Sequence, residues 1–191
     1  MERIIKTDLY RHGGLEGIIG FIRGWFQPGF RYTFFFRLVS LKKRSPLRFL
    51  FKLLKRRYRI KYGYEISSNA DIGEGFLLSD HCGHTIIGPA KIGKNCNVGH
   101  SATIGRTFKK DEEGIPTIGD KVWIGTGAVL VGKINIGSNV LIAANSFVNI
   151  DVPPNSLVLG NPAKIIKKEN PTEYYINYIL EEKPPRASKS K

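Results

Sequence analysis

The feature that most constrains this chain is an aliphatic residue that returns every six positions from residue 66 onward. The positions that share this spacing are Ile66, Ile72, Leu78, Ile86, Ile92, Val98, Ile104, Ile118, Ile124, Leu130, Ile136, Ile142 and Val148. A period of six fits neither an α-helix, with about 3.6 residues per turn, nor a long strand that alternates its two faces. It predicts short strands separated by tight turns, with each repeated aliphatic side chain pointing inward.

Strands this short cannot bury an apolar face alone, so the repeat favours a solenoid in which each strand stacks on the next coil. Three six-residue faces would make one triangular coil, and the repeats listed above give a little over four coils. A small side chain often stands four positions after the repeated residue. This set includes Cys82 and Cys96, which we therefore expect to point inward as buried, unreactive thiols.

The repeat and the stretch LGNPAKII that ends it resemble the hexapeptide-repeat acyltransferases. The match is best with the serine acetyltransferase branch, including its relatives that acetylate surface polysaccharides. It covers residues 63–168 and extends to residues 29–38. The resemblance implies a mainly β fold, a left-handed parallel β-helix; the handedness comes from the resemblance alone, because parallel crossovers are ordinarily right-handed. It also implies acetyl-CoA as donor and a homotrimer with sites between subunits.

The six-residue spacing is interrupted twice. Leu78 to Ile86 spans eight residues, and Ile104 to Ile118 spans fourteen. Extra residues cannot enter a stacked core, so they must project from a corner, where insertions often carry function. The first interruption exposes DHCGH, residues 80–84.

In the family that the chain resembles, an Asp-His pair occupies the first interruption, with the histidine as general base and an earlier carboxylate orienting it. The matching catalytic residues here are Asp80 and His81, with Glu65 where the family has aspartate. A carboxylate on one imidazole nitrogen fixes the tautomer and leaves the other nitrogen free to accept a proton. His81 would thus deprotonate an acceptor hydroxyl as it attacks the thioester in a direct transfer.

Three further residues are candidates for binding the acceptor. His100 lies 19 residues after His81, close to one coil plus the interruption, so we expect the two imidazoles on adjacent coils. His84 belongs to the loop of His81, and Arg106 opens the second insertion. Simple solvation of these polar side chains at a corner is the alternative.

The second insertion, residues 106–117, is charged and contains Gly and Pro, so we expect a mobile loop. Serine acetyltransferases carry a histidine before a proline here that helps to hold the amino acid. In this chain Ile115 precedes Pro116, which favours a sugar hydroxyl over serine as acceptor.

The resemblance places acetyl-CoA along the later coils, against small residues and, at its phosphates, basic groups. The matching positions are Thr126, Gly127, Ala143, Ala144, Gly160, Lys164, Lys167 and Lys168. Small side chains would let the thin pantetheine arm approach the backbone. A metal is not expected, because zinc enzymes on this solenoid need three converging imidazoles, and the four histidines lack that spacing.

Residues 1–62 carry nearly all of the net charge of +14, since they hold 16 Lys and Arg against three Asp and Glu. Helices are expected over residues 15–26 and 29–41 and after Ser45-Pro46, a helix-start signal. The last of these helices would place Leu47, Leu50, Phe51, Leu54 and Tyr58 on one face and Arg48, Lys52, Lys55, Arg56 and Arg59 around the other.

Two uses of residues 1–62 compete and can hold together. One is a basic surface that contacts an anionic membrane, and the other is a cap that packs on the solenoid and assembles the trimer. Nucleic-acid binding is not expected, because no recognised module is present. Residues 169–191 are expected to form a short helix, 169–182, that covers the open end of the solenoid, followed by a disordered tail, PPRASKSK.

The sequence shows neither a signal-peptide core nor an apolar run of about 18 residues, so we expect a cytoplasmic protein. If residues 1–62 contact a membrane, we expect it to be peripheral to the inner face of the plasma membrane. These observations predict an acetyl-CoA-dependent O-acetyltransferase whose acceptor is a sugar hydroxyl of a capsular or other surface polysaccharide. Serine O-acetyltransferase, of cysteine biosynthesis, is the enzymatic alternative. A non-catalytic β-helix scaffold at the membrane is the alternative of another class.

Overall fold

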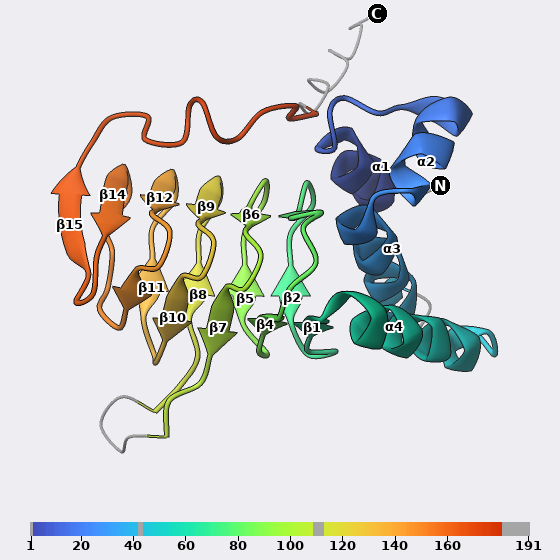
Figure 1. Cartoon of the computed structure of the whole chain (residues 1–191), viewed down its shortest axis with the longest axis horizontal. Helices are drawn as coiled ribbons and strands as arrows, with labels where there is room; N and C mark the ends of the chain where they lie inside the picture. Colours follow the sequence, from blue (N-terminus) through green and yellow to red (C-terminus); the bar gives the residue numbers. More distant parts are fainter. Residues whose placement is uncertain (1, 42–43, 109–112, 181–191) are drawn as a thin grey trace, which may run out of the picture.

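The protein is a prism of short strands with helices at one end, seen in a computed structural model that describes residues 2–41, 44–108 and 113–180 (Figure 1). The helices are α1 (Arg3–Tyr10), α2 (Gly17–Trp25), α3 (Pro28–Leu41) and α4 (Arg48–Tyr62). The strands are β1 (Tyr64–Ile66), β2 (Asp71–Ile72), β3 (Leu77–Leu78), β4 (Thr85–Ile87), β5 (Lys91–Ile92), β6 (Asn97–Val98), β7 (Thr103–Gly105), β8 (Thr117–Ile118), β9 (Val122–Ile124), β10 (Val129–Val131), β11 (Asn135–Ile136), β12 (Val140–Ile142), β13 (Phe147–Val148), β14 (Ser156–Leu159) and β15 (Lys164–Lys167).

The strands form the three faces of a triangular solenoid of about 5 turns. The five-stranded sheet runs β1-β4-β7-β10-β13, the four-stranded sheet β11-β8-β5-β2, and the six-stranded sheet β15-β14-β12-β9-β6-β3. Neighbouring strands pair in parallel, except that β15 folds back antiparallel on β14. Residues from all three faces meet in one continuous buried core, so the solenoid predicted from the six-residue period is confirmed.

One repeated position was assigned wrongly. Ile87, not Ile86, points into the core: it is 1% exposed and pairs with Ile66 and Ile104 in the neighbouring coils, whereas Ile86 is 42% exposed. The two adjacent isoleucines satisfy the same pattern, and a shift of one residue moves a side chain to the opposite face of a strand. The first interruption is therefore one residue longer than the sequence spacing indicated.

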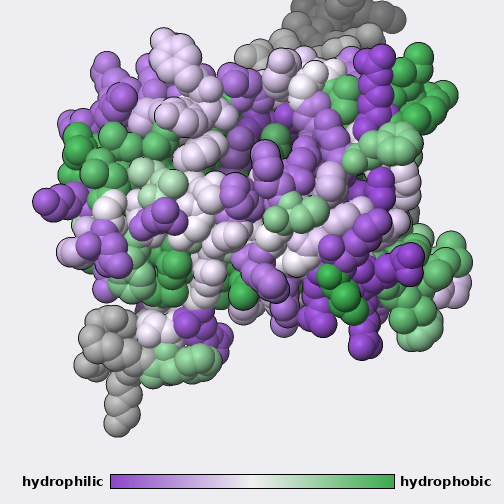
Figure 2. All heavy atoms as spheres, in the orientation of Figure 1, coloured by the Kyte–Doolittle hydropathy of each residue, from purple (hydrophilic) through white to green (hydrophobic). Residues whose placement is uncertain are grey.

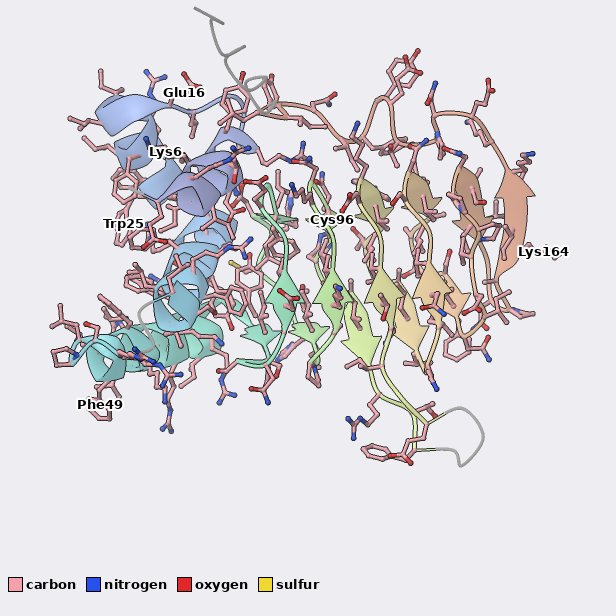
Figure 3. The ribbon with its side chains drawn as sticks, turned by 180° about the vertical axis from the view of Figure 1, so that it is seen from behind. Lys6, Glu16, Trp25, Phe49, Cys96 and Lys164 are labelled. Carbon is pink, nitrogen blue, oxygen red and sulfur yellow. The ribbon has the colours of Figure 1, made fainter. Side chains whose placement is uncertain are left out.

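The two cysteines have different environments. Cys96 points into the core, as predicted, and burial raises the pKa of its thiol to about 12 (Figure 3). Cys82, expected to be buried as well, is exposed. It lies in the projecting loop of the first interruption, where the inward-outward alternation of the strands does not apply.

A buried ion pair fixes the helices to the first coil. Arg37 of α3 donates from Nε to Asp8 of α1 at 2.7 Å, and also donates to the backbone oxygens of Ile72 at 2.5 Å and Gly73 at 2.6 Å. The Asp8 carboxylate accepts the backbone N–H of Phe76 at 2.9 Å. Both side chains are almost fully buried, so α1 and α3 share one polar joint with the solenoid.

Lys55 was expected on the exposed face of α4, but it is buried. Its Nζ donates to the backbone oxygen of Ile66 at 2.7 Å, and the Tyr32 hydroxyl accepts the N–H of the same residue at 3.0 Å. β1 is the first strand of its sheet, so these groups lack a strand partner on one side. The helices satisfy the open edge, and burial lowers the pKa of Lys55 to about 8.

This lowered pKa predicts that the contribution of Lys55 to stability rises with pH in alkaline solution. Between about 8, the folded pKa, and the ordinary 10.5, the unfolded chain binds more protons at Lys55 than the folded chain does, so unfolding becomes less favourable as pH increases. Urea denaturation between pH 8 and pH 9, which stays below the ordinary tyrosine pKa of about 10, should give a more positive slope of unfolding free energy against pH for the wild type than for Lys55→Met. The buried Cys96 thiol, whose pKa is raised, contributes to both proteins alike, and equal slopes for the two proteins would contradict the assignment.

The C-terminal segment differs from the expected helix. Residues 169–180 form turns and an extended stretch that returns along the six-stranded sheet to the helices (Figure 1). Asn170 and Tyr178 have φ values of 46° and 54°, which a right-handed helix does not allow. β15 covers the open end instead. The expected tail, PPRASKSK, lies outside the described residues.

The returning segment contacts successive coils in turn. Its contacts are Thr172 with Asn139, Tyr175 with Trp123 and Asn97, Asn177 with Arg11, and Tyr178 with Tyr10.

Within the described part of the chain, no helix combines the length and apolar character that crossing a bilayer needs.

Candidate active site

One corner of the prism gathers most of the predicted functional residues. It lies where the chain passes from the six-stranded to the five-stranded sheet, and each coil contributes one short turn there. The hydrogen bonds that stack these turns run from Ser79 N to Val98 O at 2.9 Å, Gly99 N to Ile124 O at 2.8 Å, Gly125 N to Ile142 O at 2.8 Å and Ala143 N to Val158 O at 2.8 Å. Functional side chains on this corner therefore form a row along the solenoid axis.

His81 stands at the start of this row, on the loop that the first interruption projects. Its side chain is exposed, and its ring centroid lies 5.4 Å from that of His100 on the next coil. The expected proximity of the two imidazoles is thus confirmed. The Tyr64 hydroxyl supports the loop from the core side by donating to the backbone oxygen of Ser79 at 2.8 Å.

Ser79 supplies the polar partner of His81 within the described chain. Its Oγ lies 3.3 Å from His81 Nδ1, which leaves Nε2 as the ring nitrogen available to a ligand. Sequence reasoning missed Ser79, although a hydroxyl two residues before the histidine is within reach of its ring in a tight turn.

The two predicted carboxylates do not contact His81. Glu65 is ion-paired with Arg59 at 3.1 Å, and its side chain is 57% exposed. Asp80 turns toward the helices: its Oδ1 accepts the N–H of Gly29 at 2.9 Å, and its Oδ2 lies 3.4 Å from His12 Nδ1. In this chain, therefore, neither carboxylate orients the imidazole as the resemblance implied.

His12 is a second residue that sequence reasoning did not place in the site. Its side chain is 2% exposed and packs edge-on against Phe30 at 5.8 Å between centroids. It reaches Asp80 from the turn after α1, so it links the helical region to the loop of His81. The sequence does not predict this contact, because His12 and Asp80 are far apart in the chain and share no repeat pattern.

The predicted donor-binding residues continue the row from His100. Thr126 Oγ1 lies 3.4 Å from His100 Nδ1, and the N–H of Gly127 donates to the His100 backbone oxygen at 3.0 Å. Ala143 and Ala144 occupy the equivalent turn one coil further on. Gly160 follows on the next coil, and its backbone oxygen accepts the N–H of Phe147 at 3.0 Å.

The three predicted lysines separate in the structure. Lys164 pairs with Leu159 and so lies beside the Gly160 turn, at the exposed end of the solenoid (Figure 3). Lys167 pairs with Ser156 at the other end of β15, and Lys168 follows it. Only Lys164 of the three therefore stands at the corner of His81 within one chain.

The remaining candidates are not part of the ring contact between His81 and His100. His84 is exposed at the end of the projecting loop, and Arg106 is exposed at a different corner, after β7. The expected loop after Arg106 falls partly outside the described residues. Its flanks, Thr107 and Gly114, form an antiparallel bridge. Among the described residues, no three His, Cys, Asp or Glu side chains gather closely enough to hold a metal ion.

Comparison of the sequence and fold with known proteins identifies the family of this chain. The pattern described as "Bacterial transferase hexapeptide (six repeats)" matches residues 115–149, and the "Hexapeptide repeat of succinyl-transferase" matches residues 89–106. A serine acetyltransferase of Helicobacter pylori is 30% identical over 169 residues, which cover 88% of this chain and 95% of the relative. Serine acetyltransferase 2 of Arabidopsis thaliana is 40% identical over 106 residues, or 56% of this chain and 33% of that protein.

Solved structures agree with these sequence matches. Serine acetyltransferase of Neisseria gonorrhoeae superposes with a TM-score of 0.73 at 29% identity, over 87% of this chain and 65% of that one. The soybean enzyme in complex with serine gives a TM-score of 0.69 at 32% identity, over 85% and 67%. The chain thus spans about two thirds of these solved chains, but nearly the whole Helicobacter pylori relative. We conclude that it belongs to the hexapeptide-repeat acyltransferase superfamily, in the serine acetyltransferase-like branch, and that it is an acyltransferase with the left-handed β-helix fold of that family.

Proposed function

We propose that this protein moves an acetyl group from acetyl-CoA to an acceptor hydroxyl, with His81 as the general base. The observation that carries the proposal is the exposed His81 imidazole, which stands beside His100 at the head of a row of small residues. A general base must reach the hydroxyl proton of its substrate, and His81 projects from the prism with Nε2 unengaged by the described chain.

In the proposed step the neutral His81 ring carries its proton on Nδ1 and donates a hydrogen bond from there to Ser79 Oγ, while Nε2 receives the proton of the acceptor hydroxyl. The acceptor oxygen then forms a bond to the thioester carbon, and the carbon–sulfur bond breaks. The imidazolium returns its proton to the departing thiolate, so no group remains on the protein. His100, fixed by Thr126, would hold the acceptor beside the base.

The acceptor that we propose first is serine. The relatives that cover most of this chain are named serine acetyltransferases, and one solved relative holds serine. These names support the serine alternative better than the polysaccharide acceptor favoured from the sequence. We also propose a homotrimer with its sites between subunits, in which Arg106 would approach the His81 of a neighbouring subunit.

A sugar hydroxyl is the second candidate, because two observations favour an acceptor without an amino group. Ile115 stands before Pro116 and packs against the core, where the family resemblance expects a histidine that holds the amino acid. The carboxylate of Asp80 is already engaged by Gly29 and His12. The loop of His81 therefore has no unengaged carboxylate, within the described chain, for an ammonium group.

Thiol release from acetyl-CoA tests both acceptors. The purified full-length protein should release CoA rapidly and saturably when L-serine is added, and slowly with a panel of hexoses and N-acetylhexosamines. Rapid release with sugars and none with serine would reverse this ranking. Absence of acceptor-dependent release with every compound would favour the non-catalytic scaffold instead.

A further inference from the structure

The outward face of α4 carries large apolar side chains that the fold leaves uncovered. Phe49 is 70% exposed, Leu53 47% and Ile60 71%, and their spacing places them on one side of the helix. Leu50, which the sequence places on the apolar face of this helix, is also 48% exposed. In Figure 3 the labelled Phe49 points away from the solenoid. This apolar stripe is therefore not part of the core.

The opposite side of α4 accounts for the packing of the helix. Tyr58 stacks on Phe35 of α3 at 5.3 Å between centroids, and Tyr62 stacks on Tyr58 at 5.5 Å. The inward side thus has its partners within the chain, and the outward stripe is surplus to the fold.

Basic side chains stand within the stripe and on both sides of it. Lys52, Arg56, Arg57 and Lys61 are exposed, and the whole of α4 contains no acidic residue. Leu53, Arg56, Arg57, Ile60 and Lys61 line a shallow hollow of about 520 Å³. Figure 2 shows hydrophobic and hydrophilic side chains interleaved over this part of the molecule. Apolar side chains mixed with long cationic ones match a layer that is apolar below and anionic at its surface.

A second copy of this chain fits the surface less well. If two α4 helices met about a two-fold axis, the cations of one copy would lie close to those of the other, because α4 carries no acidic residue, and like charges in contact are unfavourable. An anionic partner has no such penalty. The positive charge around the stripe therefore favours an anionic partner over a second copy of this chain.

We propose that the outward face of α4 docks on an anionic phospholipid membrane. Phe49, Leu53 and Ile60 would enter the boundary between headgroups and acyl chains, and Arg56 and Arg57 would contact lipid phosphates. The solenoid, with the corner of His81, would then stand on the cytoplasmic leaflet by its helical end. This inference does not depend on the acceptor of the acetyl group.

Vesicle co-sedimentation of the full-length protein tests this docking. The protein should sediment with equimolar phosphatidylglycerol and phosphatidylcholine vesicles, and much less with phosphatidylcholine alone. High salt should weaken the binding, because it screens exposed charges. The double substitution Arg56→Gln and Arg57→Gln should lower the partition coefficient about 25-fold, at about fivefold for each basic residue. Phe49→Ser should weaken binding further without changing the dependence on salt.

A control with the same change of charge separates the α4 face from net charge. Lys91→Gln and Lys133→Gln remove two exposed cations from the solenoid and should leave vesicle binding within about twofold of the wild type. The Arg56/Arg57 variant should retain its melting temperature and its acetyl transfer to a soluble acceptor. Equal binding by the two double variants, binding to phosphatidylcholine alone, or a change of oligomeric state in place of vesicle binding would each overturn the proposal.

Discussion

Replacing His81 with alanine should lower the rate of acetyl transfer by about 10²- to 10⁴-fold, the usual contribution of a general base. The exposed imidazole is the group that would take the hydroxyl proton, and the described chain offers no second base in contact with it except His100. The measurement is acceptor-dependent CoA release by matched amounts of wild type and variant. Addition of free imidazole should restore part of the lost rate, because it can enter the space that the side chain leaves.

His84→Ala is the matched control for this experiment. His84 shares the loop and the exposure of His81, but among the described residues it is the His81 ring that contacts His100, so removal of His84 should change the rate by only a few-fold. Circular dichroism and melting should be unchanged for both variants, since neither side chain is in the core. A His81→Ala protein with wild-type turnover would remove the assigned base.

Replacing Asp8 with alanine should destabilise the protein by about 3–5 kcal/mol, because it leaves the Arg37 guanidinium buried without its counter-charge. The loss corresponds to a fall in melting temperature of roughly 6–20 °C for a chain of this size. Urea denaturation, followed by circular dichroism, measures the free energy of unfolding. The milder change Asp8→Asn keeps one acceptor oxygen and serves if the alanine variant does not fold.

An exposed ion pair supplies the contrast. Arg59→Ala breaks the pair with Glu65, in which both side chains are largely exposed, and should cost no more than about 1 kcal/mol. The double substitution Asp8→Ala with Arg37→Met should recover part of the stability that Asp8→Ala loses. If Asp8→Ala and Arg59→Ala had equal effects, the joint between helices and solenoid would not have the role described.

The six-residue period predicted the solenoid because every coil must fill the same narrow interior with one aliphatic residue per face. The period could not choose between Ile86 and Ile87, since both fit it, and only the pairing with Ile66 and Ile104 decides. Lys55 shows a similar limit. A helical wheel places Lys55 among the other cations of the helix. In the structure its Nζ is buried because it donates a hydrogen bond to the Ile66 carbonyl, which has no strand partner at the sheet edge.

The constant number of residues per coil also explains why the proximity of His81 and His100 could be predicted. His81 and His100 are about one coil apart in sequence, so stacking alone brings them together. The partner of Asp80 could not be found in this way, because His12 reaches it through the docking of helices that lie outside the repeat. The path of residues 169–180 depends likewise on a surface, formed by several coils, that no local pattern encodes.

The returning C-terminal segment changes how such a repeat protein can come apart. In a simple stack each coil touches only its neighbours, so the terminal coil can fray without disturbing the rest. Here residues 172–178 span from Asn139 to Tyr10 and join coils that are not adjacent. We therefore expect opening of the last coil to be coupled to release of the N-terminal helices, so that the repeat array unfolds as one cooperative unit.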